Sequence, residues 1–197
     1  MARATVAVHY DFASTLCYVA HRVMERMAPD LAAFEIDLVW SPLDLTELSH
    51  WRRGARLDGE GRDNALRVAR ELGVSVRIPA AWPDSRRALG VSLALAGDPP
   101  REVAWRERVW SALHEEGRVL DAPGELESLA ADLGLDLAAL APERRLEELS
   151  VRTELAREAG VFAIPAFMLG GWPIAGIQTD DTMRSLLGRW AARRAGG

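Results

Sequence analysis

The sequence contains no lysine, because all 24 of its lysine and arginine positions are arginine. Schiff-base chemistry on a lysine is therefore excluded. Blocks of like charge are also missing, since basic and acidic residues alternate and the formal net charge is only -5. Nucleic-acid and membrane-surface binding both require a concentrated positive face, so we expect no nucleic-acid partner and no membrane partner.

The sequence has little cysteine and no long apolar run. Its single cysteine, Cys17, cannot form an internal disulfide, which suits a reducing compartment. No apolar segment approaches the ~20 residues that span a bilayer, and no signal-peptide pattern precedes the first strand-like segment. We therefore expect a cytoplasmic location. Apolar residues make up 49% of the 197 positions, which is enough for a sizeable core.

Hydrophobic periodicity predicts a βαβ unit at the start of the chain. Residues 4–10 have the pattern of a buried strand, residues 16–27 that of a helix, and residues 30–40 that of a second strand, which Ser41-Pro42 ends. Such a unit implies two parallel strands and a right-handed crossover.

The middle of the chain is predicted to be helical over roughly one hundred residues, which is too long for a loop. Proline or glycine stands at nearly every junction between the predicted helices, which cover residues 62–72, 85–95, 101–116, 123–133 and 142–159.

After this helical block the strand pattern returns. The pattern predicts a hairpin with strands at residues 166–169 and 173–175 and a turn at Gly170-Gly171. A final helix is predicted over residues 180–192. The simplest architecture is an α/β fold split by a helical insertion.

The first segment that could carry chemistry is the junction between the first strand and the first helix, where Ser14 and Cys17 lie. Backbone N–H groups at a helix start lack helical partners, and the helix dipole stabilises a thiolate there. A purely structural interpretation is also open, with Ser14 as an ordinary N-cap and Cys17 as a small core residue.

The second segment is Ala163-Ile164-Pro165, in which the proline directly precedes a predicted strand. Proline has no N–H for a strand ladder, so this position implies a strand end or a cis bond. The plain alternative is that Pro165 only ends the preceding helix.

Together the two segments resemble the DsbA-like thioredoxin superfamily, in which a C-x-x-C type motif follows the first strand and a cis-proline precedes a later one. Other segments are similarly placed in that superfamily: Val39–Leu45, Arg67–Gly73 and Gly176–Gln178. The resemblance implies a thioredoxin-like fold with an all-helical insertion domain. Together with the place of Pro165 at a strand start, the resemblance also predicts that the Ile164–Pro165 bond is cis. We assign residues 1–43 and 150–197 to the thioredoxin-like domain and residues 44–149 to the insertion.

The sequence has features of two branches of the superfamily. Thiol-disulfide oxidoreductases use C-x-x-C, but Ser14 stands here at the attacking position. The 2-hydroxychromene-2-carboxylate isomerases and kappa-class glutathione transferases carry a serine after an Asp-Phe pair, as in Asp11-Phe12-Ala13-Ser14. Thr15-Leu16 replaces the Pro-Tyr usual in that branch, and Gly176-Ile177-Gln178-Thr179 looks more like the oxidoreductases.

By resemblance, the protein is an enzyme that binds and activates a small thiol such as glutathione, with no tightly bound cofactor. Ser14 and Cys17 are the expected catalytic residues, and the expected substrate-binding residues are Phe12, Ala163, Ile164 and Pro165. The second substrate is an electrophile, and the relatives imply a homodimer. Two alternatives stay open: a degenerate oxidoreductase that uses Cys17 with an external thiol, and a non-catalytic binding protein.

Histidine and tryptophan give weaker signals. The four histidines show no i, i+4 pairing with one another, and no zinc-ligand set can be built with a single cysteine, so we predict no metal site. The seven tryptophans include Trp51, Trp82, Trp105 and Trp110. They are expected either to line an apolar pocket or to pack in the core.

Overall fold

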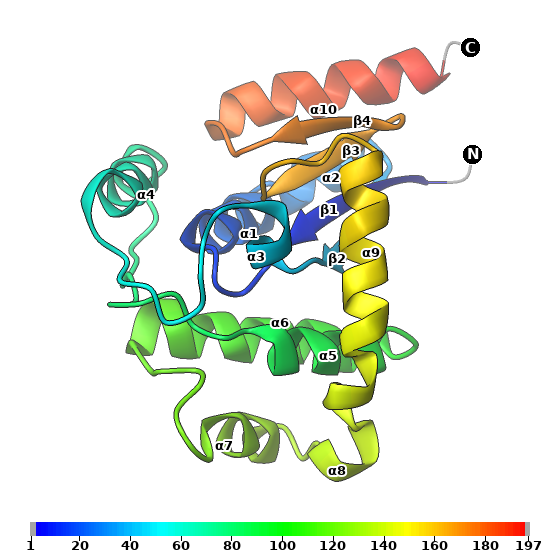
Figure 1. The fold of residues 1–197 in the computed structure, drawn as a ribbon. Helices are drawn as coiled ribbons and strands as arrows, with labels where there is room; N and C mark the ends of the chain where they lie inside the picture. Colours follow the sequence, from blue (N-terminus) through cyan, green and yellow to red (C-terminus); the bar gives the residue numbers. More distant parts are fainter. Residues whose placement is uncertain (1–2, 196–197) are drawn as a thin grey trace.

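A computed structural model describes residues 3–195 of the chain, and its centre is a mixed four-stranded sheet (Figure 1). The strands are β1 (Ala4–Tyr10), β2 (Ile36–Pro42), β3 (Ala166–Leu169) and β4 (Trp172–Ala175), in the spatial order β2-β1-β3-β4. β1 and β2 are parallel, whereas β1 with β3 and β3 with β4 are antiparallel. The predicted βαβ unit and hairpin are both confirmed.

The segment between β1 and β2 corrects one prediction. Helix α1 (Thr15–Arg26) is followed by a second helix, α2 (Ala28–Ala33), where residues 30–33 were expected to be strand. Pro29 lies in the first turn of α2, where a missing N–H costs nothing, and a turn at Glu35 with φ 54° then leads into β2.

The rest of the chain is mainly helical, as the periodicity predicts. The remaining helices are α3 (Leu45–Leu48), α4 (Gly59–Glu71), α5 (Arg86–Ala94), α6 (Pro99–Ser111), the π-helix η1 (Ala112–Glu116), α7 (Glu125–Asp132), α8 (Leu137–Leu140), the 3-10 helix η2 (Pro142–Arg145), α9 (Leu146–Glu158) and α10 (Asp180–Ala195). The helices α3 and α8 each have four residues, which is too short for a periodic signal.

The hairpin that joins β3 to β4 turns at Gly170 and Gly171, whose φ angles are 63° and 87°. Two consecutive positive φ angles are the backbone of a type I′ turn, and glycine adopts them without steric cost. The turn returns the chain along β3 and places α10 beside the hairpin (Figure 1).

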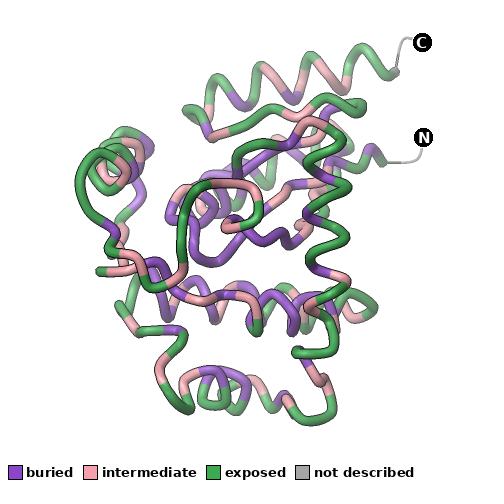
Figure 2. The backbone as a smooth tube through the Cα atoms, in the orientation of Figure 1, coloured by how far each residue is buried: buried purple, intermediate pink, exposed green. Residues whose placement is uncertain are grey.

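The core lies between the sheet and the helices that cover it (Figure 2). Val6 and Val8 of β1 are fully buried, and so are Trp105 and Trp110 of α6. These two tryptophans therefore serve packing. Helices α7 and α8 lie at the end of the molecule opposite α10 (Figure 1).

In this arrangement a helical insertion separates the βαβ unit from the terminal hairpin and helix, as the resemblance to a thioredoxin-like fold implies. The exact domain limits proposed at residues 43 and 150 stay a prediction. Within residues 3–195, no helix combines the length and hydropathy that crossing a membrane requires.

Candidate functional site

Ser14 is the N-cap of α1. Its φ and ψ are -85° and 108°, and its side-chain oxygen accepts a hydrogen bond from the Cys17 N–H at 3.3 Å. The cap satisfies one of the N–H groups that a helix start leaves free. The hydroxyl hydrogen of Ser14 is not needed for this bond, so it can be offered to a ligand.

Cys17 lies one turn into α1 with no exposed surface. Burial raises the pKa of its thiol to about 12. The thiolate is therefore scarce near neutral pH. The burial of Cys17 follows from its position on the inner face of an amphipathic helix.

The Ile164–Pro165 peptide bond is cis, as the sequence predicts. It directly precedes β3, and the Pro165 carbonyl accepts a hydrogen bond from the Gly176 N–H at 2.7 Å. Ile164 and Pro165 are buried, whereas the preceding Ala163 and Phe162 are exposed. The segment therefore presents backbone groups and one aromatic ring at the surface.

One pocket of about 320 Å³ joins the start of α1 to this segment. Its lining includes Ser14 from the first and Ala163 and Ile164 from the second, although about 150 positions separate them in the chain. The fold thus brings three of the six predicted site residues to one cavity. Cys17 and Pro165 do not contribute to the lining.

Phe12 is placed differently from the prediction. Its side chain is fully buried, with its ring 5.3 Å from that of Tyr10 and 5.6 Å from that of Trp110 between centroids. A side chain with no exposed surface cannot touch a substrate, so Phe12 supports the site from the core. An aromatic residue at the end of a buried strand can be recruited by packing alone.

Comparisons with known proteins identify the family. Residues 5–188 match the DSBA-like thioredoxin domain. The chain belongs to the DsbA-like thioredoxin family. No curated protein matches the sequence.

Solved structures with low sequence identity share the DsbA-like fold. A 2-hydroxychromene-2-carboxylate isomerase matches with a TM-score of 0.71 and 22% identity over 98% of both chains. A probable DsbA oxidoreductase from Streptomyces coelicolor has a TM-score of 0.72 and 20% identity, covering 95% of this chain and 90% of its own. The cytosolic disulfide reductase DsbM from Pseudomonas aeruginosa, with GSH, has a TM-score of 0.64 and 20% identity over 98% of both chains.

Asp11, the first residue of the Asp-Phe pair before Ser14, carries a buried carboxylate. Asp11 accepts hydrogen bonds from the Ala13 N–H at 2.9 Å, the Ser85 hydroxyl at 2.5 Å and the Leu45 N–H at 2.8 Å. Burial raises its pKa to about 6 against the effect of these bonds. Asp11 therefore connects the loop before Ser14 to the starts of α3 and α5.

His114 holds the same loop from the other side. Its Nε2 lies 3.2 Å from the Phe12 carbonyl and its Nδ1 lies 3.3 Å from the Arg77 carbonyl, while its ring stacks on Tyr18 at 5.0 Å. Burial lowers its pKa to about 4, so the ring is neutral and donates to only one of the two carbonyls. The π-helix η1 that carries His114 has no sequence signal that periodicity could detect.

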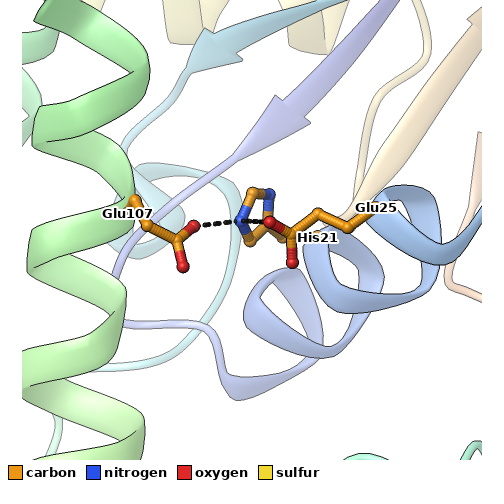
Figure 3. A group of neighbouring side chains, drawn as sticks. All are labelled: His21, Glu25 and Glu107. Atoms are coloured by element: carbon orange, nitrogen blue, oxygen red, sulfur yellow. Dashed lines mark hydrogen bonds and ion pairs between the residues drawn. The ribbon is translucent and has the colours of Figure 1, made fainter. Parts of the chain in front are cut away.

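His21, Glu25 and Glu107 form a further group of side chains that could bind a metal (Figure 3). His21 Nε2 lies 2.5 Å from Glu107 and 3.5 Å from Glu25. The shorter distance is that of a hydrogen bond, because two ligands of one tetrahedral zinc ion lie ~3.4 Å apart.

An arginine already forms ion pairs with both of these carboxylates. Arg22 Nη1 lies 2.6 Å from both Glu25 and Glu107, and its Nη2 lies 2.6 Å from Glu115. The hydrogen bond from His21 lowers the pKa of Glu107 to about 2. We therefore assign the group to a network of ion pairs that joins α1 to α6 and η1.

Proposed function

We propose that this DsbA-like protein is an enzyme that binds a small thiol such as glutathione and activates it for transferase or isomerase chemistry. Ser14 donates its hydroxyl hydrogen to the ligand sulfur, and the positive end of the α1 dipole stabilises the thiolate. The observation that supports this most is the shared pocket, which Ser14 lines together with Ala163 and Ile164. Backbone groups of those two residues can then pair with an extended thiol ligand.

The burial of Cys17 distinguishes this proposal from its main alternative. A degenerate oxidoreductase needs Cys17 as an accessible nucleophile, but its thiol has no exposed surface and its pKa is raised by burial. The remaining alternative is a non-catalytic protein that binds thiols, which would bind glutathione without stabilising its thiolate.

A thermal-shift series with glutathione tests whether thiols bind. Glutathione should raise the melting temperature of the parent protein, because a ligand that binds only the native state stabilises it. Ser14→Thr keeps the hydroxyl and should keep the shift. Ser14→Asp keeps the N-cap but offers no hydroxyl hydrogen and adds a negative charge, so the shift should be lost.

The ionisation of bound glutathione tests whether binding leads to activation. Ultraviolet absorbance of the thiolate should show that the pKa of the bound thiol lies below that of free glutathione. A hydrogen bond to a charged group contributes about 1.5–3 kcal/mol, so Ser14→Ala should weaken thiolate binding roughly tenfold or more. Ser75→Ala, an exposed serine outside the pocket, is the matched control. An unchanged thiol pKa in the complex would favour the non-catalytic alternative, and no binding of any small thiol would reject the proposal.

The proposal includes an electrophilic second substrate, a cytoplasmic location and a homodimer. The cytoplasmic location is supported by the single cysteine, which cannot form an internal disulfide. Light scattering coupled to size-exclusion chromatography tests the homodimer directly.

A further inference from the structure

A tight turn of four residues, from Asp11 to Ser14, leads from β1 into α1. The Ser14 N–H donates to the Asp11 carbonyl at 3.1 Å, which is the hydrogen bond that closes a β-turn. A type II turn needs a positive φ at its third residue, and the primed types need one at the second. Neither Phe12 nor Ala13 is among the non-glycine residues with positive φ, so the turn is of type I.

The peptide group between Phe12 and Ala13 decides the type of this turn, because turning that peptide over converts type I into type II. Its N–H, on Ala13, donates to Asp11 Oδ1 at 2.9 Å. Its carbonyl, on Phe12, lies 3.2 Å from His114 Nε2. Two buried side chains therefore hold the two sides of the one peptide that sets the course of the chain into Ser14.

His114 reaches the turn from the π-helix η1, which continues α6. A π-turn contains one residue more than an α-turn, so the residues after it are rotated by about 100° relative to a continuous α-helix. Two hydrogen bonds hold η1 in place: the Arg118 N–H donates to the Ala112 carbonyl at 2.8 Å, and the Arg77 N–H donates to the His114 carbonyl at 2.6 Å. Single π-turns are rare and are frequent at functional sites.

Two carbonyls compete for the single N–H of the neutral His114 ring. The Phe12 carbonyl faces Nε2 and the Arg77 carbonyl faces Nδ1, at 3.2 Å and 3.3 Å. The contact with Phe12 is buried, whereas that with Arg77 is only partly buried, so water can replace a missing bond more readily there. Leaving a buried carbonyl unpaired is destabilising, which favours the tautomer with its proton on Nε2.

We infer that His114 is a positioning residue of the thiol site, whose Nε2–H holds the Phe12 carbonyl and so keeps the Ser14 hydroxyl directed toward the pocket. This inference rests on the proposed function, because Ser14 is the residue that His114 positions. Ser14 lines the pocket, and a turn that is fixed before the thiol arrives does not have to be ordered on binding.

The tautomer of His114 is the first test. Long-range correlation of ring protons with ring nitrogens by NMR distinguishes the two neutral tautomers in protein labelled at its four histidines. Variants of the other three histidines assign the signals of His114 by elimination, so the measurement needs no His114 variant that folds. We expect the proton on Nε2. A ring that has its proton on Nδ1 would overturn the inference.

Two variants then separate positioning from packing. In His114→Gln the side-chain amide nitrogen reaches about as far as Nε2, whereas in His114→Asn it lies near the place of Nδ1. Both lose the stacking on Tyr18, so the stability of both should fall alike in urea denaturation. His114→Gln should bind the glutathione thiolate within about twofold of the parent, and His114→Asn about fivefold more weakly, because only the first can donate to the Phe12 carbonyl.

The control is His50→Gln, at an exposed histidine outside both the turn and the lining of the pocket, and it should bind like the parent. Equal binding by His114→Gln and His114→Asn would overturn the inference, since loss of packing affects the two alike. A parent protein that bound no thiol would reject the proposed function, whereas thiol binding that both His114 variants share equally would reject only the role of His114. If neither variant folds, the tautomer in the parent protein decides.

Discussion

At the scale of single residues, Ser14 and Cys17 show what local sequence can predict. The structural interpretation of the helix start has Ser14 as an N-cap and Cys17 as a core residue, and the structure has both features. Being a cap does not prevent Ser14 from lining the pocket, so the structural interpretation and the functional one are compatible. Phe12 shows what local sequence cannot predict. An aromatic residue at a strand end packs equally well in a core or in a binding site, and Phe12 lies in the core.

Cys17 should react very slowly with thiol reagents in the native protein. Its thiol pKa is raised from 9.0 to about 12, so near neutral pH the thiolate population falls about 1,000-fold through ionisation alone. The check is the labelling rate with an aromatic disulfide reagent, measured natively and in denaturant. A native rate within tenfold of the denatured rate would contradict this burial and would revive the single-cysteine oxidoreductase.

Ser14→Cys should create a dithiol that cycles with Cys17. Residues three apart at a helix start have Cα atoms about 5 Å apart, within the ~4.4–6.8 Å that a disulfide spans. The new thiol at the N-cap should attack, and Cys17 should resolve the mixed disulfide. We expect the variant to reduce insulin with dithiothreitol and the parent to lack this activity.

A matched control for this variant is Ser75→Cys, which also adds a second thiol but at an exposed position away from α1. It should show no catalysed insulin reduction. If oxidised Ser14→Cys protein still has two free thiols, the two positions lack the geometry of a thioredoxin-type active site.

At the scale of elements, length decides what the sequence can predict. Helices α4, α5 and α6 each extend over at least nine residues and were predicted from periodicity, whereas α3 and α8 were missed. The strand predicted over residues 30–40 begins only at Ile36, because Pro29 starts a short helix that the apolar pattern conceals. The π-helix η1 was included in a longer α-helix, since the change in hydrogen-bond register leaves no compositional mark.

Gly90→Ala should destabilise the fold, although alanine normally favours a helix over glycine by about 1 kcal/mol. Gly90 lies inside α5, where a Cβ would stand 2.5 Å from the backbone carbonyl oxygen of Pro142 in η2. Backbone cannot move aside as a flexible side chain can, so we expect a loss of about 1–3 kcal/mol in the free energy of unfolding. Urea denaturation measures this change.

The control is Gly97→Ala, where a Cβ meets no atom within 4 Å. That substitution should stay within about 0.5 kcal/mol of the parent. A Gly90→Ala variant as stable as the parent would mean that α5 and η2 do not approach so closely.

At the scale of the whole molecule, the family resemblance supplies what periodicity cannot. The parallel pairing of β1 with β2 follows from the βαβ pattern, but the pairing of β1 with β3 joins segments that the helical block separates. The pocket is built in the same way, with walls from α1, from the loop around Trp51, from Trp82 and from the segment before β3. Contacts at such sequence separation have no local signal, so the residues that line the pocket together could not be recognised from the sequence beforehand.

Asp11 should make the stability of the whole fold depend on pH. Its pKa in the folded protein is about 6, above the ordinary 3.8, so the folded state favours the protonated acid. The contribution of Asp11 to stability is therefore fully present below about pH 4 and is lost as pH rises through 6. A difference of about two pKa units corresponds to about 3 kcal/mol.

Asp11→Asn removes the titrating carboxyl group, so comparing the parent with this variant isolates the contribution of Asp11 to the pH dependence of stability. We expect the parent-minus-variant difference in unfolding free energy to fall by about 3 kcal/mol between about pH 4 and pH 7, whatever its absolute value. Asp121→Asn, at an exposed carboxylate, should leave the pH profile of the parent unchanged. A difference that stays flat, or that rises with pH, would mean that the hydrogen bonds from Ala13, Leu45 and Ser85 outweigh the burial of Asp11. The carboxylate would then stabilise the junction between the sheet and the helical block in its ionised form.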